Sequence, residues 1–168
     1  VFISTRNTVV TNCTFFNCLY IFENLHRSNT IENCKFIDCE NQILYVSAYF
    51  GCTTSFDACE FRNITQSVPS KSLFYMSPDK SGSGLIIKNC VFDNITLAEH
   101  GTIVKNGTVH SKIKFFNGKI SECTFGKIIR KSKTPVIEKY GSYIGAFDKK
   151  HTYYAYSIHN CSGLDGLL

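Results

Sequence analysis

A short phrase recurs six times along this chain and constrains its fold more than any other feature. Each copy has an apolar residue, a spacer, usually Asn, then Cys, a second spacer and usually Phe. The cysteines of the phrase are Cys13, Cys34, Cys59, Cys90, Cys123 and Cys161. They follow one another at intervals of about 20 to 40 residues, which is typical of solenoid repeat proteins. We therefore expect one structural unit to be repeated along the chain.

The phrase predicts two strand segments joined by a tight corner. Side chains alternate between the faces of a strand, so Cys34 and Phe36 share one face. Ile31 lies an odd number of positions before Cys34, which would put it on the wrong face of a straight strand. A bend at Asn33 removes this conflict, because Asn tolerates the left-handed conformation of a tight corner. Four copies have Asn at this position, namely Asn12, Asn33, Asn89 and Asn160.

A second phrase follows the first three copies and predicts a further strand. Its copies are Leu19-Tyr20-Ile21, Leu44-Tyr45-Val46 and Phe74-Tyr75-Met76. Strand alternation puts Tyr on the opposite face from its two apolar neighbours. Variable stretches separate the repeats, among them residues 77–84 and 140–150, as insertions do in repeat proteins.

The two phrases together predict an all-β solenoid of parallel strands. Helix is disfavoured, because the apolar spacing is two and β-branched and aromatic residues dominate. A β-sandwich gives no reason for Cys and Phe to recur at equivalent positions. We expect about five to six coils of three short strands, since stacking lets each coil bury its inward face. Residues 1–168 are expected to form a single domain.

The I-x-N-C-x-F phrase followed by an alternating strand resembles the right-handed parallel β-helix of the pectin-lyase-like superfamily. Within it, the chain is similar to Cys- and Asn-rich repeats of large surface proteins of the polymorphic outer-membrane type. The resemblance implies an internal ladder of Asn12, Asn33, Asn89 and Asn160, interrupted by Ala58 and Glu122. It also implies internal stacks of the six cysteines and of five aromatic residues, Phe15, Phe36, Phe61, Phe92 and Phe125.

The nine cysteines are expected to be mostly free thiols. An in-register column of cysteines rarely gives the dihedral angle of a disulfide, although neighbouring coils are close enough for one, so pairing stays open. Cys18 and Cys39 form a second equivalent pair, whereas Cys52 has no counterpart and is the candidate for a reactive or paired thiol. A metal site is not expected, because no C-x-x-C spacing occurs, and no cofactor is predicted.

Five N-x-S/T sequons favour a secreted or cell-surface glycoprotein. Asn63, Asn94 and Asn106 are the candidate acceptors, because they are predicted at turns. For Asn63 and Asn94, simple turn chemistry is an equal alternative. Asn12 and Asn160 are poor acceptors, because they are corner residues.

Charge and composition limit the partners. The net charge is +5, Trp is absent, and no array of basic and stacking residues indicates a nucleic-acid module. No apolar run is long enough for a transmembrane helix. The chain begins without Met and is expected to be a segment of a longer solenoid. A glycan, a protein surface, neighbouring coils of a longer parent or a second copy are the expected partners.

Two functions follow from this fold, and no catalytic residue is predicted for the first. The first is a non-catalytic extracellular scaffold or adhesion module whose loops contact a glycan or a protein. The second is a polysaccharide lyase or glycoside hydrolase, which needs clustered carboxylates. One outward column holds Glu32, Asp57, Lys88, Ser121 and His159, and another holds Asp38, Asn63 and Asn94. Neither column has three acids, which favours the scaffold over the enzyme. A viral or phage spike, which can also be a β-helix, is a third possibility.

Overall fold

The structure is a computed structural model that describes residues 2–3, 7–23, 28–48, 53–78, 83–109, 116–144 and 150–168. In these ranges the chain forms twenty β-strands and no helix. Most strands belong to three parallel sheets, here named A, B and C, and a small sheet D is mixed. None of the described segments is a helix long and apolar enough to cross a membrane. The predicted all-β class with parallel strands is confirmed.

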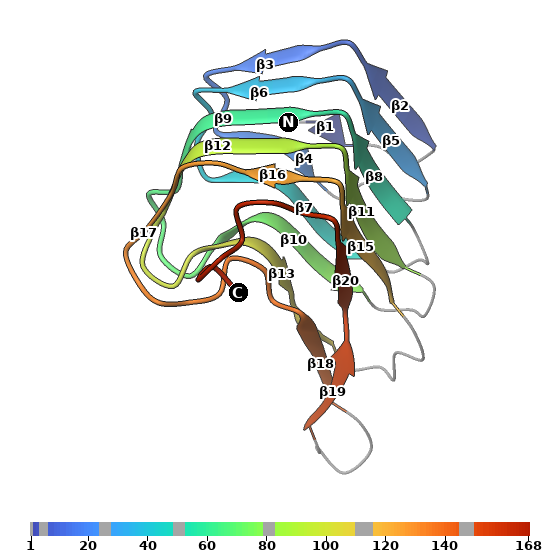
Figure 1. Cartoon of the computed structure of the whole chain (residues 1–168). Coiled ribbons are helices and arrows are strands. Elements are labelled where there is room, and N and C mark those ends of the chain that lie inside the picture. The colour runs from blue at the N-terminus through green and yellow to red at the C-terminus, as the bar shows by residue number, and fades with distance from the viewer. Residues whose placement is uncertain are drawn as a thin grey trace.

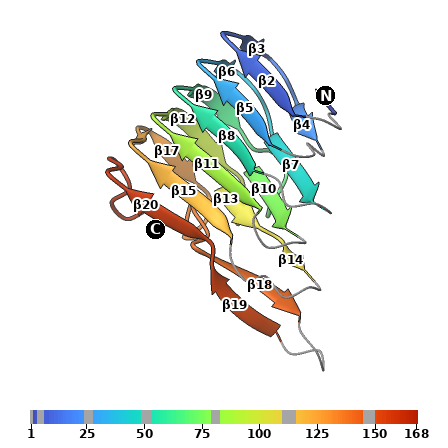
Figure 2. The same cartoon turned by 90° about the vertical axis from the view of Figure 1, so that its right-hand side faces the viewer.

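Equivalent strands lie next to one another in each sheet (Figures 1 and 2). Sheet A has the order β1 (Phe2–Ile3), β4 (Tyr20–Glu23), β7 (Gln42–Ala48), β10 (Ser72–Pro78) and β13 (Thr102–Asn106). Sheet B has the order β2 (Thr8–Thr11), β5 (Asn29–Glu32), β8 (Thr53–Asp57), β11 (Gly84–Lys88), β15 (Asn117–Ser121) and β20 (Tyr156–His159). Sheet C comprises β3 (Thr14–Phe16), β6 (Lys35–Ile37), β9 (Glu60–Thr65), β12 (Val91–Leu97) and β16 (Thr124–Phe125), and β17 (Ile128–Arg130) also pairs with β12. Sheet D comprises β14 (Thr108–Val109), β18 (Tyr140–Ile144) and β19 (Lys150–Tyr154).

The chain visits sheets B, C and A in turn, and we call one such passage a circuit. β2, β3 and β4 form one circuit, and β5, β6 and β7 form the next. The strand registers bring equivalent residues together, so that Phe36 pairs with Phe61 and Phe61 with Phe92. This arrangement explains the recurring phrase, because a single circuit cannot bury its own inward face and needs a similar circuit beside it.

The last circuits depart from this order. After β17 no described strand pairs with sheet A, and the β-ladder contact with it is reduced to the bridge between Val104 and Ile137. It then forms the antiparallel hairpin of β18 and β19, which projects from one end of the sheets (Figure 1).

The corner between sheets B and C lies at the predicted residue. The φ angle is 51° at Asn33 and 54° at Asn89, and Ala58 adopts the same left-handed conformation at 51°. The backbone N–H of Asn33 donates to the carbonyl oxygen of Asp57 at 3.0 Å, which ties the corner to the next circuit. The predicted bend is therefore confirmed.

The second phrase is in register only in two of its three predicted copies. Tyr45 pairs with Tyr75, as the alternation requires, but the equivalent residue in the preceding circuit is Glu23. Tyr20 pairs with Gln42 instead. The equivalence of Leu19-Tyr20-Ile21 with Leu44-Tyr45-Val46 was therefore wrong. The register follows the hydrogen-bonded pairing of β4 with β7 rather than the identity of the residues.

Candidate functional site

The five recurring phenylalanines form one continuous stack inside the molecule. The ring centroids of Phe36 and Phe61 are 4.8 Å apart, and those of Phe61 and Phe92 are 4.7 Å apart, with nearly parallel planes. Phe15 and Phe125 continue the stack at its two ends, at 4.9 and 5.0 Å. These side chains are buried, except for the half-buried Phe15. The stack is therefore structural and offers no group for chemistry.

The six cysteines of the phrase occupy equivalent positions just after each corner and carry free thiols. The thiol of Cys59 donates to the carbonyl oxygens of Asp57 at 3.3 Å and Ile31 at 3.6 Å, and Cys34, Cys90, Cys123 and Cys161 follow the same pattern. Burial raises the pKa of Cys34 and Cys39, which keeps these thiols protonated and unreactive. Cys13 is exposed and Cys161 half-buried, so only the ends of the column meet solvent. Cys52 lies outside the described residues.

The asparagine ladder lies on the outside of the molecule, so the implied internal position was wrong. Asn12, Asn33, Asn89 and Asn160 are all exposed. The Nδ2 of Asn33 donates to Oδ1 of Asn12 at 2.6 Å. The side chain leaves the outer side of the bend, because the inner side at this level is filled by the apolar core.

Acidic side chains replace the amides where the ladder is interrupted. The Nδ2 of Asn89 donates to Asp57 Oδ1 at 2.8 Å, because Ala58 has no acceptor to offer. The Nδ2 of Asn160 donates to Glu122 Oε1 at 2.9 Å. At both interruptions an acidic side chain thus supplies the acceptor for the amide of the following circuit.

A second ladder of the same kind crosses sheet C, where Asn63 and Asn94 form bends within β9 and β12. The φ angles of Asp38, Asn63 and Asn94 lie between 53° and 55°. The Nδ2 of Asn94 donates to Asn63 Oδ1 at 2.8 Å, and the Nδ2 of Asn63 donates to Asp38 Oδ1 at 2.9 Å. Both asparagines are exposed, and a glycosylated amide keeps one N–H for the ladder. Glycosylation of Asn63 and Asn94 therefore stays a prediction.

Asn106 is placed differently from the other two sequon asparagines. It is 5% exposed, and its Nδ2 atom is buried. A glycan attached to this nitrogen has no room in the folded protein, so the prediction of Asn106 as an acceptor was wrong. The burial comes from Tyr156, whose hydroxyl donates to Asn106 Oδ1 at 2.9 Å although the two residues are far apart in sequence.

The outward column on sheet B brings Glu32, Asp57 and Lys88 together, as the repeat register implies. Lys88 Nζ lies 2.8 Å from Asp57 Oδ2. Partial burial acts to raise the pKa of Asp57, but hydrogen bonds from Lys88 and Asn89 outweigh it and hold that pKa below its usual value. A carboxylate that is ionised and paired in this way is a poor general acid, because it has no proton to give near neutral pH. Arg62 likewise pairs on sheet C with Glu60 and Asp93, at 3.0 Å each.

The outer face of sheet A carries a row that the sequence did not indicate as a site. Register partners place Glu23, Tyr45, Tyr75 and Lys105 side by side on four neighbouring strands. The rings of Tyr45 and Tyr75 are stacked, with centroids 5.2 Å apart and planes 7° apart. A Cβ atom at Gly107 would clash with the Tyr75 hydroxyl, so glycine at this position leaves room for the Tyr75 side chain. We call these four residues the sheet A row.

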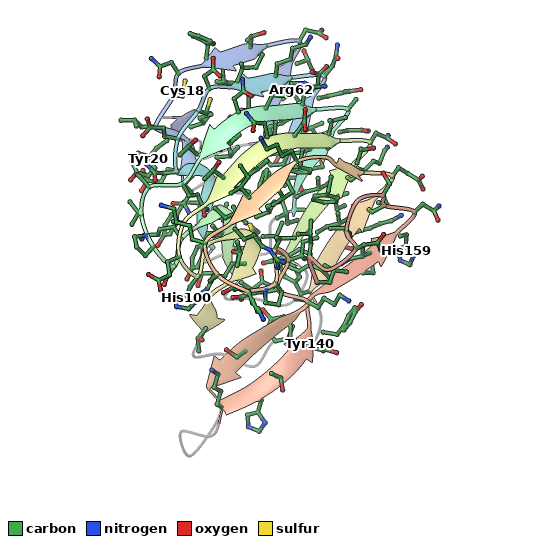
Figure 3. All side chains as sticks on the ribbon, turned by 60° about the vertical axis from the view of Figure 1, so that its left-hand side comes forward. Cys18, Tyr20, Arg62, His100, Tyr140 and His159 are labelled. Atoms are coloured by element: carbon green, nitrogen blue, oxygen red, sulfur yellow. The ribbon has the colours of Figure 1, made fainter. Side chains whose placement is uncertain are left out.

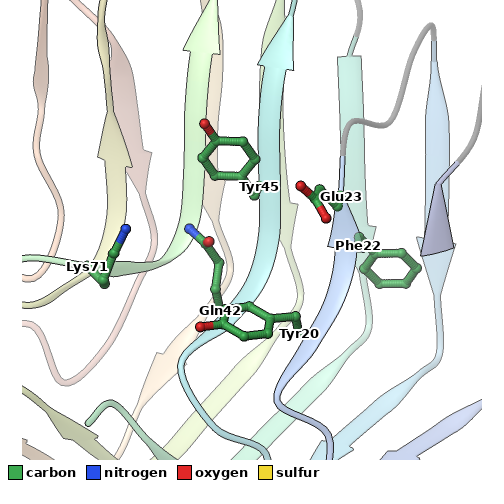
Figure 4. A pocket seen from close by; sticks show the side chains of 6 residues that line it. All are labelled: Tyr20, Phe22, Glu23, Gln42, Tyr45 and Lys71. Atoms are coloured by element: carbon green, nitrogen blue, oxygen red, sulfur yellow. The ribbon is translucent and has the colours of Figure 1, made fainter. Parts of the chain in front are cut away.

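A groove of about 360 Å³ opens beside the sheet A row (Figure 4). It is lined by Tyr20, Phe22, Glu23, Gln42, Tyr45 and Lys71. Tyr20 is 51% exposed and stands next to its register partner Gln42. Within the described residues neither Glu23 nor Lys71 forms an ion pair, which leaves one carboxylate and one ammonium group for a ligand. The alternating Tyr was visible in the sequence, but only the strand register shows that Tyr20 and Tyr45 belong to different rows on sheet A.

The predicted display loops are only partly described, since residues 79–82 and 145–149 lie outside the described ranges. No group of three or more His, Cys, Asp or Glu residues in the described part of the chain could hold a metal ion. No protein-family model matches the sequence, and no curated protein matches it either.

Proposed function

We propose that the chain is a right-handed parallel β-helix that serves as a non-catalytic extracellular or cell-surface scaffold and contacts a glycan through the outer face of sheet A. The order of the circuits through three parallel sheets supports the β-helix. Connections between parallel strands of one sheet are almost always right-handed, which supports the handedness.

The observation that carries the glycan proposal is the groove next to the stacked tyrosines of the sheet A row. A sugar ring has an apolar C–H face and a rim of hydroxyl groups. Tyr20 and Tyr45 offer aromatic faces with polar tips, which suits both features. Gln42, Glu23 and Lys71 add hydrogen-bond donors and acceptors around the rings.

The charges in this groove favour a ligand without net charge. Glu23 and Lys71 supply opposite charges, so neither sign is in excess among the lining residues. Glu23 and Tyr45 of the sheet A row line the groove, and the row continues beyond it on strands spaced about 4.8 Å apart. An oligosaccharide lying along the row would thus meet Tyr45 and Tyr75 in succession.

A glycan array tests this proposal directly. Wild-type protein is expected to bind neutral oligosaccharides, and Tyr20→Ala and Tyr45→Ala are each expected to weaken binding by up to about tenfold, since one aromatic stacking contact contributes roughly 0.5–1.5 kcal/mol. Phe16→Ala is the matched control, because Phe16 is 63% exposed on sheet C and lies outside the groove. An array without signal, or equal loss in Phe16→Ala, would count against the groove. Turnover of a bound glycan would overturn the non-catalytic part.

The predicted glycosylation has a separate test. Expression through a eukaryotic secretory pathway is expected to give glycosylation at Asn63 and Asn94 and none at Asn106, because only the first two amides are exposed. Peptide mapping before and after enzymatic deglycosylation reads this out, with Asn63→Gln and Asn94→Gln as controls. Occupied Asn106 in the native protein would contradict the structure.

A further inference from the structure

Sheet B ends in an edge strand on each side. Within the described residues, β2 forms one edge and pairs only with β5, whereas β20 forms the other edge and pairs only with β15 (Figure 2). An edge strand presents backbone N–H and C=O groups that can pair with another strand. β2 and β20 have four residues each and run in the same direction, so the two edges match each other in length and orientation.

The backbone hydrogen bonds at the corner between sheets B and C follow one pattern. The N–H of the corner residue donates to the next circuit, as Asn33 N–H does to the carbonyl oxygen of Asp57 at 3.0 Å. The N–H of the residue after the cysteine donates to the preceding circuit, as Lys35 N–H does to the carbonyl oxygen of Cys13 at 2.8 Å. Both bonds recur at each later corner, so the pattern assigns a direction to every such group.

The first and last circuits carry the two halves of one more corner of this kind. By the same pattern, Thr14 N–H and the carbonyl oxygen of Thr11 point away from the stack at the first circuit. The N–H of Asn160 and the carbonyl oxygen of Cys161 point away from it at the last circuit. Placing β2 of a second copy beside β20 brings Asn160 N–H to Thr11 and Thr14 N–H to Cys161, which repeats both backbone bonds.

The side-chain ladder at this corner also has a direction. Asn33 Nδ2 donates to Asn12 Oδ1 at 2.6 Å, and Asn160 Nδ2 donates to Glu122 Oε1 at 2.9 Å. Each amide thus donates to the preceding circuit and offers its oxygen to the following one. The first circuit therefore ends in the Nδ2 donor of Asn12, and the last circuit ends in the Oδ1 acceptor of Asn160. The two ends complement each other, whereas two like ends do not.

Apolar side chains at the two ends are less buried than their equivalents in the middle. Val10 and Ile158 are half-buried, whereas the equivalent Ile31 and Ile120 are each 1% exposed. Figure 3 shows Cys18 near one end of the stack and His159 near the other. The half-buried members of the core at these ends are Val10, Phe15 and Cys18 on the first circuit, and Ile158, Cys161, Leu164 and Leu167 on the last. Burial of this apolar surface favours association.

We propose that the chain binds a second copy of itself head to tail, with β2 of one copy extending sheet B beside β20 of the other. The equivalence of the strands places Val10 next to Ile158 of the other copy. This contact joins two different surfaces, so each added copy leaves one edge of each kind open and further copies can follow. The edges are formed by residues other than those of the groove on sheet A, so the inference does not depend on the groove binding a glycan.

Sedimentation velocity over a dilution series measures this association. The average mass is expected to rise with concentration beyond that of two chains, because a head-to-tail contact does not close. A thiol reductant is kept in the buffer, so that a disulfide of the exposed Cys13 is not the cause. The mass of a single chain at every concentration overturns the proposal. A mass that stops at two chains overturns the head-to-tail arrangement, because two like ends form a closed dimer.

Thr14→Pro and Thr14→Ala test the backbone pairing. Proline is tolerated as the first residue of an edge strand, which is the place of Thr14 in β3, but it has no N–H to donate. Thr14→Pro is expected to weaken the association by about tenfold or more, because the carbonyl oxygen of Cys161 is left unpaired in the contact. Thr14→Ala keeps the N–H and is expected to associate as the wild type does. Equal association of the two variants overturns the edge pairing.

A mixture of variant and wild type tests the direction of the contact. Thr14→Pro changes only the edge at the first circuit, so a labelled sample is expected to bind wild-type protein through β20 and to lower the mass of its assemblies. A contact between two like ends at the first circuit predicts no such binding. Absence of binding in the mixture therefore overturns the head-to-tail arrangement.

Asn12→Asp supplies an independent check on the ladder. Aspartate keeps an oxygen for Asn33 and tolerates the φ of 56° at this corner, but it places a carboxylate against Asn160 Oδ1 of the other copy. It is expected to weaken the association by about tenfold or more. Val68→Asp adds the same charge at an exposed residue between β9 and β10 and is expected to have no effect. Equal losses overturn the proposal, because they indicate an effect of net charge. If Thr14→Pro does not fold, this pair of variants still decides the question.

Discussion

Phe92→Ala removes a ring from the middle of the phenylalanine stack. Phe92 is fully buried and lies between Phe61 and Phe125, with ring centroids at 4.7 and 5.0 Å. The ring of Phe74 on sheet A meets it edge-on at 6.1 Å. The substitution therefore removes contacts with two neighbouring circuits and with a second sheet.

The expected loss of stability is about 3–5 kcal/mol, the usual range for a buried Phe replaced by Ala. Each aromatic contact accounts for roughly 0.5–1.5 kcal/mol of such a loss. The cavity has little freedom to collapse, because β12 is hydrogen-bonded to β9 on one side and to β16 on the other. We therefore expect the upper half of the range, which is a large part of the roughly 5–15 kcal/mol that stabilises a typical domain.

Equilibrium unfolding in urea measures this loss, and Phe16→Ala is the matched control. Phe16 lies in β3 of the same sheet and is 63% exposed, so its replacement is expected to change the free energy of unfolding by about 0.5 kcal/mol or less. Hydrogen exchange resolves the effect by circuit, because repeat proteins can unfold in parts. A loss for Phe92→Ala within about 1 kcal/mol of the control would refute the stacked core.

Three further predictions concern the corners, the outer column and the thiols. Ala58→Gly should stabilise the protein by about 1 kcal/mol, because Ala58 holds a φ of 51° that glycine adopts without strain; a lower midpoint in urea would argue the opposite. Burial acts to raise the pKa of Asp57, but hydrogen bonds, first from Lys88, bring it below its usual value. The ionised Asp57 therefore contributes to the free energy of unfolding above about pH 4, and this contribution is lost as the pH falls through the pKa of the folded state. Asp57→Asn should accordingly narrow the difference between melting temperatures at neutral pH and at about pH 3, and an unchanged difference would speak against the pairing. Alkylation of the native protein with peptide mapping should modify the exposed Cys13 well before the buried Cys90, and equal rates would contradict the internal column.

Much of the interior could be predicted from the sequence because strand alternation and corner conformation are local properties. The spacing of Cys34 and Phe36 predicted a shared face, and both are buried in the structure. The odd offset of Ile31 predicted a bend at Asn33, and the positive φ there agrees. Neither inference required knowledge of any distant part of the chain.

The candidate sites depended on contacts between distant segments. In the sequence, Tyr20 was aligned with Tyr45 because both are tyrosines. The strand register pairs Tyr20 with Gln42 instead, and both residues line the groove. Asp57 was taken as one acid of a possible pair, but Lys88 from the next circuit neutralises it. Glu32 and Lys88 are both neighbours of Asp57 in the repeat register. No pattern in the sequence indicates that Lys88 is the one that makes the close contact.

Asn106 is the clearest case in which the sequence alone could not predict the burial of a residue. As a residue of an N-x-T sequon before Gly107, it had the features of an exposed turn. The hairpin of β18 and β19 and the Tyr156 hydroxyl bury it, and that hairpin belongs to no repeat.

The sequence by itself determined the recurring circuit, the bends and the inward stack, since these follow from side-chain alternation and backbone sterics within a few residues. Only the tertiary structure decided that the Asn33 amide faces outward, which residues share the outer face of sheet A, and that Asn106 is buried. Burial and pairing are properties of neighbours in space, and these neighbours come from other circuits at variable distances along the chain.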